Sequence, residues 1–204
     1  MNKINFIHIP KNGGSSLKQI CKKYKFKLVY NPHKVNVKNK INQLIILRNP
    51  IDRFISSVYY CIEKWSHEEQ IKNLIEKGIN TPEKWIEVWS NPEHEYYDLL
   101  MKEMLNVNHM IGNKKPKYKW TYCKQVEWFD KPRFIIIMDN YEDEIKILFN
   151  KLGIKYNLPK VNSTKKKDKF LSEKSINFLK EYFKEDFEIY NKYKQLSSKE
   201  RLKF

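Results

Sequence analysis

The chain has 204 residues, of which 41% are hydrophobic, 14% aromatic and 31% charged, and its formal net charge is +16. This composition excludes a disordered chain, and the length suits one domain with a substantial core. The charge predicts an anionic partner: a nucleotide, an acidic glycan, a nucleic acid or an acidic membrane surface.

Short apolar strands alternate with helical segments along the chain. The continuous apolar run at residues 44–47 is typical of a strand buried on both faces. Thr81 followed by proline, Gly153 and Ser172 mark helix boundaries. In chain order, we expect strands at 4–9, 26–30, 44–47 and 133–138, and helices at 15–24, 51–64, 82–89, 95–105, 142–152 and from Ser172 onward. The alternation predicts an α/β layered fold, with a mostly parallel central sheet flanked by helices, in a single domain of residues 1–204.

Residues 10–17 (PKNGGSSL) join the first strand to the first helix. Paired glycines let the backbone fold tightly around a ligand, and a helix N-terminus offers N–H groups and a positive dipole end to an anion. Lys11 adds a charge, and Ser15 and Ser16 add hydroxyl donors. The pattern is not a Walker A motif, in which the lysine follows the glycines. The alternative is an ordinary Gly-Gly turn with a serine cap.

Residues 44–60 (LIILRNPIDRFISSVYY) form the second motif. The buried strand delivers Arg48 at its carboxyl end, where ligands bind in open α/β sheets. Ser56 follows in the next helix, so that Arg48 and Ser56 could both reach one phosphate. The alternative pairs Arg48 with Asp52 and makes Ser56 a packing residue. Arg53 is expected to be a structural or surface arginine.

Together these motifs resemble the sulfotransferase superfamily, in particular the carbohydrate branch that includes heparan-sulfate 2-O-sulfotransferases. HIPKNGGSSL resembles that family's loop for the 5′-phosphosulfate end of the donor PAPS (3′-phosphoadenosine-5′-phosphosulfate), and RNPIDRFISSVYY resembles its motif for the 3′-phosphate. Residues 158–190 look like the family's C-terminal segment, in which a basic loop at 158–169 closes over the nucleotide. The resemblance implies a P-loop-like fold and a sulfotransferase that moves a sulfuryl group from PAPS to a hydroxyl, with sugar as the favoured acceptor.

The resemblance also implies roles for individual residues. Lys11 would contact the transferring sulfuryl group and the leaving phosphate, while Arg48 and Ser56 would hold the 3′-phosphate. The remaining loop contacts would come from Asn12, Gly13, Gly14, Ser15 and Ser16, and the closing basic loop would contribute Asn162, Ser163 and Lys166. Residues 65–132 match no motif, and we expect them to shape the acceptor site.

A hydroxyl acceptor needs a general base, and histidine is the commonest choice near neutral pH. Members of the glycan 2-O-sulfotransferase group place a histidine between the second strand and the 3′-phosphate strand. His33 lies in that interval, so it is the predicted base; a solvent-exposed loop histidine is the alternative. His8, within the first strand, is expected to be structural. The next candidates for the base are His67, His94 and His109.

Several partners and cofactors are not expected. No acidic residues cluster in sequence next to the glycine loop, so no metal is expected. The three cysteines form no CxxC pair, which predicts free thiols and a reducing compartment. No apolar run reaches the length of a membrane span, and no signal peptide is apparent, so we expect a cytoplasmic protein. A small P-loop kinase and a basic nucleic-acid-binding protein are the alternative functions, and the acceptor's identity and the oligomeric state stay open.

Overall fold

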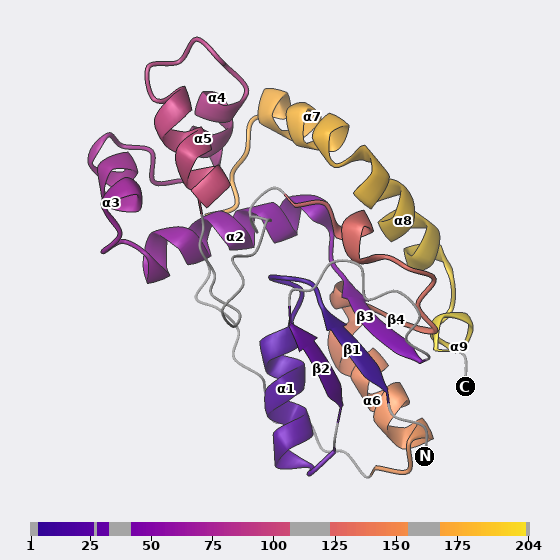
Figure 1. Ribbon diagram of the computed structural model, residues 1–204. Helices are drawn as coiled ribbons and strands as arrows, with labels where there is room; N and C mark the ends of the chain where they lie inside the picture. The colour runs from indigo at the N-terminus through magenta and orange to yellow at the C-terminus, as the bar shows by residue number, and fades with distance from the viewer. Residues whose placement is uncertain (1–3, 27, 33–41, 107–122, 155–167, 203–204) are drawn as a thin grey trace. The chain divides into compact units, whose positions relative to one another are not determined.

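A computed structural model describes residues 4–26, 28–32, 42–106, 123–154 and 168–202 (Figure 1). The chain divides into two compact units, each assembled from separate stretches of sequence. Met1–Pro50, Lys124–Lys167 and Glu185–Phe204 make the first unit, and Ile51–Cys123 and Asp168–Lys184 make the second. The organisation as one sulfotransferase domain stays a prediction.

The first unit contains a four-stranded parallel sheet. Its strands are β1 (Asn5–His8), β2 (Val29–Pro32), β3 (Gln43–Leu47) and β4 (Phe134–Ile137), in the order β2-β1-β3-β4. Every neighbouring pair is parallel. The predicted α/β class with a parallel central sheet is therefore confirmed. The carboxyl ends of β1 and β3 lie at the same edge of the sheet, which places the glycine loop and Arg48 at that edge.

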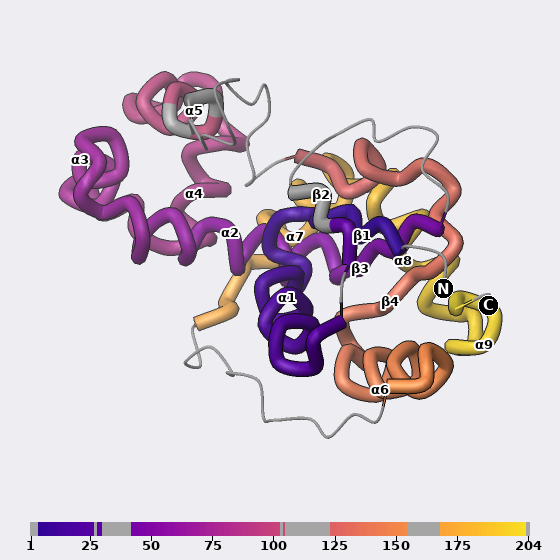
Figure 2. The backbone as a smooth tube through the Cα atoms, turned by 60° about the horizontal axis from the view of Figure 1, so that its bottom comes forward, coloured from indigo at the N-terminus to yellow at the C-terminus, as the bar shows by residue number. Residues whose placement is uncertain are grey.

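Two helices of the first unit cover one face of this sheet (Figure 2). They are α1 (Gly14–Lys23) and α6 (Tyr141–Lys151). Their apolar residues share one buried cluster with the strands, comprising Phe6, Leu17, Ile20, Leu44, Ile46, Phe134, Ile136, Ile145, Leu148 and Phe149, among others. The isoleucines and leucines that point to the other face are buried as well. The continuous apolar runs at 44–47 in β3 and 134–137 in β4 suit this burial on both faces.

Four further helical elements belong to the first unit. They are the 3₁₀ helices η1 (Gln125–Trp128) and η2 (Met138–Asn140) and the α-helices α8 (Lys184–Gln195) and α9 (Ser198–Arg201). Just after α9, Leu202 forms an isolated antiparallel bridge with Phe134 of β4 and is fully buried. The C-terminal residues thus reach the edge strand of the sheet.

The second unit is helical and has an aromatic core. It comprises α2 (Pro50–Lys64), α3 (Glu69–Glu76), α4 (Pro82–Trp89), α5 (Tyr97–Asn106) and α7 (Glu173–Tyr182). Trp89 lies at the centre, with its ring centroid 4.9 Å from that of Phe178 and 4.6 Å from that of Tyr182. Phe54 stacks on the same tryptophan at 5.9 Å. Aromatic pairs of this kind stabilise a core beyond their buried area.

The predicted helix starts at Thr81 and Ser172 are confirmed, because each side chain accepts a hydrogen bond from the backbone three residues later. Gly153 has a φ of 72°, as expected for a residue that ends a helix. Three expectations were wrong. The connection after α2 contains the helix α3, the second strand begins at Val29 rather than residue 26, and the final helix is interrupted at Phe183 and followed by α9.

All three cysteines are free and buried. Burial raises the pKa of the Cys21 thiol to about 12, which keeps it in the unreactive thiol form. Within the described parts of the chain, no helix is long and apolar enough to cross a membrane.

Candidate functional site

The loop between β1 and α1 has an unusual backbone. Lys11 has a φ of 65° and Gly13 a φ of 76°, so both lie in the left-handed region, which a lysine rarely adopts. Such strained positions concentrate at functional sites. The next helix, α1, has no side-chain cap at Gly13 and no acidic residue in its first turn. Its N-terminal N–H groups are therefore available to an anion, as the motif predicts.

The two glycines are required by their neighbours. A Cβ atom on Gly14 would lie 2.0 Å from Cδ2 of His8, because the imidazole packs directly over this position. At Gly13, a Cβ atom would lie 2.9 Å from Sδ of Met138, and the left-handed φ adds strain for any other residue. At Gly13 and Gly14 the loop therefore packs so closely against His8 and Met138 that it leaves no room for a side chain.

Asn12 braces the loop from inside. Its side chain is 1% exposed, and its Nδ2 donates both to the carbonyl oxygen of Ile46 and to Oε1 of Gln125, each at 2.6 Å. Gln125 in turn binds the backbone of Arg48 twice: Oε1 accepts from the Arg48 N–H at 3.1 Å, and Nε2 donates to the Arg48 carbonyl at 2.8 Å. The loop and the end of β3 are therefore held by one network of amides.

Arg48 also contacts the loop directly. Its Nη1 donates to the carbonyl oxygen of Lys11 at 2.9 Å. The structure therefore brings together the predicted sulfuryl-binding lysine and the predicted 3′-phosphate arginine at the carboxyl edge of the sheet. Ser56 lies in α2, in the second unit, and is half-buried. Asp52 of the same helix forms an ion pair with Lys169 at 2.8 Å.

Sequence reasoning missed two residues of this network, Gln125 and Asp186. The carboxylate of Asp186 accepts from the N–H groups of Gln125, at 2.7 Å, and of Val126, at 2.9 Å. Both side chains are 1% exposed. Gln125 stands in a stretch without a motif, and Asp186 stands in a helix whose charged residues look like a solvated face. No local signal marks either residue.

A cavity of about 440 Å³ lies beside the loop. Ser16 forms one wall, and residues 138–143 form the rest. The lining residues include Asp139, Glu142 and Asp143, so acidic residues lie near the glycine loop in space although none cluster next to it in the sequence. The sequence separates the two stretches, and only β4 lying in the same sheet as β1 brings them together. Among the described residues, no group of histidines, cysteines and carboxylates is arranged to hold a metal.

Asp139 is already engaged by α8. Its carboxylate accepts from the hydroxyl of Tyr190 at 2.7 Å and from Nζ of Lys194 at 2.8 Å. Partial burial opposes ionisation of Asp139, but these hydrogen bonds outweigh it, and the pKa of Asp139 lies below its usual value. Its charge is therefore balanced within the protein.

The predicted base, His33, and the predicted loop contacts Asn162, Ser163 and Lys166 lie outside the described residues, as does His109. His8 is buried and stacks on Phe6, with ring centroids 5.7 Å apart, which fits its expected structural role. His67 is largely exposed near Glu68. His94 accepts a hydrogen bond at Nδ1 from the N–H of Tyr96 at 3.2 Å.

Comparison with known proteins decides the family. The model of the sulfotransferase family matches residues 1–194. The chain belongs to the sulfotransferase family. A search of curated proteins and a search of solved structures each found no match. Family membership indicates a transferase that moves a sulfuryl group. The matched stretch includes both motifs, the amide network and the residues that line the cavity.

Proposed function

We propose that this sulfotransferase takes the sulfuryl group from PAPS and transfers it to a hydroxyl group of a carbohydrate. The observation that carries the proposal is the contact between the two motifs, in which Arg48 binds the carbonyl of Lys11 at 2.9 Å. Because this contact brings the glycine loop and the end of β3 together, it supports the proposal that one anionic donor binds to both. The family match favours this activity over a P-loop kinase or a nucleic-acid-binding protein.

The loop has the chemistry that a phosphosulfate needs. The first turn of α1 carries no acidic residue and no side-chain cap, so its N–H groups and dipole suit an anion. Gly13, Gly14, Ser15 and Ser16 would supply these contacts, with Asn12 holding the loop in shape. The cavity beside Ser16 offers space for a further part of the nucleotide.

PAPS supplies an activated sulfuryl group, and the protein's task is to position it and to balance charge. Lys11 would neutralise the charge that grows on the bridging oxygen as its bond to sulfur breaks. Arg48 and Ser56 would hold the 3′-phosphate, and Arg48 suits this role because its planar fork matches a phosphate. Asn162, Ser163 and Lys166 would close over the nucleotide.

His33 is the proposed general base, which would take the proton of the acceptor hydroxyl as the new sulfur–oxygen bond forms. The basis for this assignment is its place between β2 and β3 in the sequence. Replacing His33 by alanine should reduce turnover by about 10²–10⁴ and spare binding of the product PAP (3′-phosphoadenosine-5′-phosphate). His67→Ala is the matched control, because His67 is largely exposed. Equal turnover of the two variants would remove His33 from the mechanism.

The test of the function is transfer of radiolabelled sulfate from PAPS to a panel of acidic and neutral glycans, with tyrosine peptides and small phenols as further acceptors. We expect labelled glycan with the wild-type protein and a strongly reduced amount with Lys11→Ala. Label on peptides or phenols alone would contradict the carbohydrate acceptor. No label on any acceptor, together with phosphoryl transfer from ATP, would contradict the donor.

A further inference from the structure

Residues 138–143, here called the β4–α6 turn, comprise η2 and the first three residues of α6 and lie beside the proposed donor site. Sδ of Met138 lies 2.9 Å from the position that a Cβ atom of Gly13 would take, so the turn packs against the glycine loop. With Ser16, the same residues line the cavity. The position of this turn therefore sets both the support beneath the loop and the size of the cavity.

The turn has little to hold it in place by itself. Its first half is η2, a single short 3₁₀ turn. Asn140, at the N-cap of α6, makes no side-chain capping hydrogen bond. A 3₁₀ turn has weaker hydrogen bonds than an α-helix, and an uncapped helix start is prone to fraying. Contacts from elsewhere in the chain are needed to fix its conformation.

One such contact comes from α8. The Asp139 carboxylate accepts from the Tyr190 hydroxyl and from Lys194 Nζ, at 2.7 and 2.8 Å. Tyr190 is 2% exposed, so its hydroxyl has little access to water and relies on its protein partners, Asp139 and Lys194. Burial and the hydrogen bond to Asp139 raise the pKa of Tyr190 to about 12, so the hydroxyl stays protonated and remains a donor.

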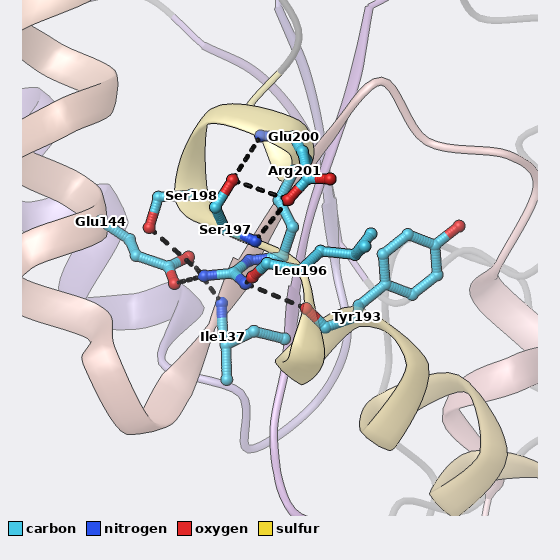
Figure 3. A network of polar contacts seen from close by, with 8 residues as sticks. All are labelled: Ile137, Glu144, Tyr193, Leu196, Ser197, Ser198, Glu200 and Arg201. Carbon is cyan, nitrogen blue, oxygen red and sulfur yellow. Dashed lines mark hydrogen bonds and ion pairs between the residues drawn. The ribbon is translucent and has the colours of Figure 1, made fainter.

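A second contact comes from α9, whose Arg201 meets Glu144 of α6 (Figure 3). Glu144 accepts from the N–H of Ile137 at 2.9 Å and forms an ion pair with Arg201. The two charged side chains are almost completely buried, at 0% and 3% exposed. Arg201 also donates to the carbonyl oxygens of Tyr193, at 2.9 Å, and of Leu196, which end α8. Glu144 therefore ties the end of β4 and the start of α6 to the C-terminal residues.

The start of α9 is itself well defined. Ser197 and Glu200 form a reciprocal capping box, in which Glu200 Oε2 accepts from the Ser197 N–H at 2.7 Å. This box fixes the helix that presents Arg201 to Glu144. The family model ends at residue 194, so α9 and Arg201 lie beyond the stretch that it matches.

We propose that Tyr190, Lys194 and Arg201, together called the C-terminal clamp, are positioning residues that hold the β4–α6 turn against the glycine loop for nucleotide binding. The clamp holds the turn at Asp139, which lines the cavity, and at Glu144, the residue that follows the lining stretch. The expected effect of the clamp on nucleotide affinity rests on the proposed function. Its effect on the turn and the loop can be measured without any ligand.

Hydrogen exchange of the unliganded protein, followed by mass spectrometry, tests the mechanical part. Tyr190→Phe removes the donor to Asp139 and keeps the ring. Tyr193→Phe is the matched control, since it makes the same change one turn away and, among the described residues, its hydroxyl has no hydrogen-bond partner. We expect Tyr190→Phe to raise exchange about tenfold in peptides covering residues 137–144 and also 10–17, with Tyr193→Phe unchanged.

A second pair of variants guards against unfolding of Tyr190→Phe. Lys194→Met removes the exposed donor to Asp139, and Lys192→Met is its control on the same helix. We expect faster exchange in the same two peptides for Lys194→Met alone, by a few-fold because the ion pair is exposed. The clamp proposal would be overturned if hydrogen exchange became faster only in α8, or if a variant and its control exchanged at the same rate.

The nucleotide arm measures PAP affinity of the same folded variants by titration calorimetry. We expect Tyr190→Phe to weaken PAP about fivefold to tenfold relative to Tyr193→Phe. Unchanged PAP affinity in a variant whose turn exchanges faster would overturn the positioning role. If the wild-type protein itself does not bind PAP, the proposed function fails, and the exchange results decide on the clamp separately.

Discussion

Arg48 and Arg53 stand close together in the sequence but lie in opposite environments. Arg48, in the first unit, is half-buried at the end of β3 and contacts the glycine loop through the Lys11 carbonyl. Arg53, in the second unit, is 0% exposed within α2, donates to the Cys123 carbonyl and lies 5.5 Å from the ring centroid of Phe183. The same residue type thus lies beside the proposed donor site in one unit and in the core of the other. Whether an arginine is expected to bind a ligand or to stabilise the fold therefore depends on its surroundings and not on the residue type.

The largest expected effect is on the core arginine. Arg53→Ala should lower the free energy of unfolding by about 3–5 kcal/mol, because it leaves a cavity and an unpaired buried carbonyl. Urea unfolding measures this, with the exposed Lys64→Ala in the same helix as control. PAP affinity should be unchanged under conditions where the variant is folded. A loss below about 1 kcal/mol would contradict the core role.

The next effect is catalytic. Lys11→Ala should reduce the single-turnover rate at saturating PAPS by about 10²–10³, because the lost contact strengthens only as charge develops in the transition state. Lys18→Ala, on the exposed side of α1, provides the control. An unchanged rate for Lys11→Ala would show that the lysine plays no part in the transfer step.

Arg48→Ala should weaken PAP binding by about 2–4 kcal/mol while costing only about 1 kcal/mol of stability. The reason is that a phosphate contact is lost together with one hydrogen bond to Lys11. Arg48→Lys, which keeps the charge but loses the fork, should recover only part of the affinity. If calorimetry gives equal PAP affinity for wild type and Arg48→Ala, then Arg48 resembles Arg53 in being structural, and the contrast between the two units fails.

The smallest effect concerns pH. The folded-state pKa of Asp139 is lowered, so its contribution to stability is full above the unfolded value of about 3.9 and is lost as pH falls through the folded value. Asp139→Asn should therefore reduce the free energy of unfolding at pH 6, by less than about 1 kcal/mol because Asp139 and Lys194 are both partly exposed. The difference between variant and wild type should shrink as the pH is lowered below 4. Urea unfolding across this range measures it, and a constant difference would contradict the assignment.

The glycine loop and Arg48 could be predicted from the sequence because their signals are local. The loop can be located from a Gly-Gly pair between a predicted strand and a predicted helix. Arg48 can be located because it ends an apolar run, and neither step needs knowledge of the fold. Thr81, Gly153 and Ser172 act in the same way, since capping depends on neighbours a few residues away.

Gln125 and Asp186 could not be predicted, because their roles depend on contacts between distant parts of the chain. Nothing near Gln125 indicates that its amide meets Asn12, which is 113 residues away. The helix α3 was missed since only Ile71 and Leu74 are buried, which gives a weak apolar stripe. The interruption at Phe183 was missed because the apolar spacing continues through it.

The most direct test of the account is titration of the wild-type protein with PAP in the presence of a metal chelator. We expect saturable binding at one site without any metal, and a rise in stability of about 2.7 kcal/mol when PAP is at a hundred times its Kd. This result would show that the glycine loop and Arg48 form a nucleotide site that needs no cation. Absence of PAP binding, together with clear binding of ATP that requires Mg²⁺, would contradict the central claim.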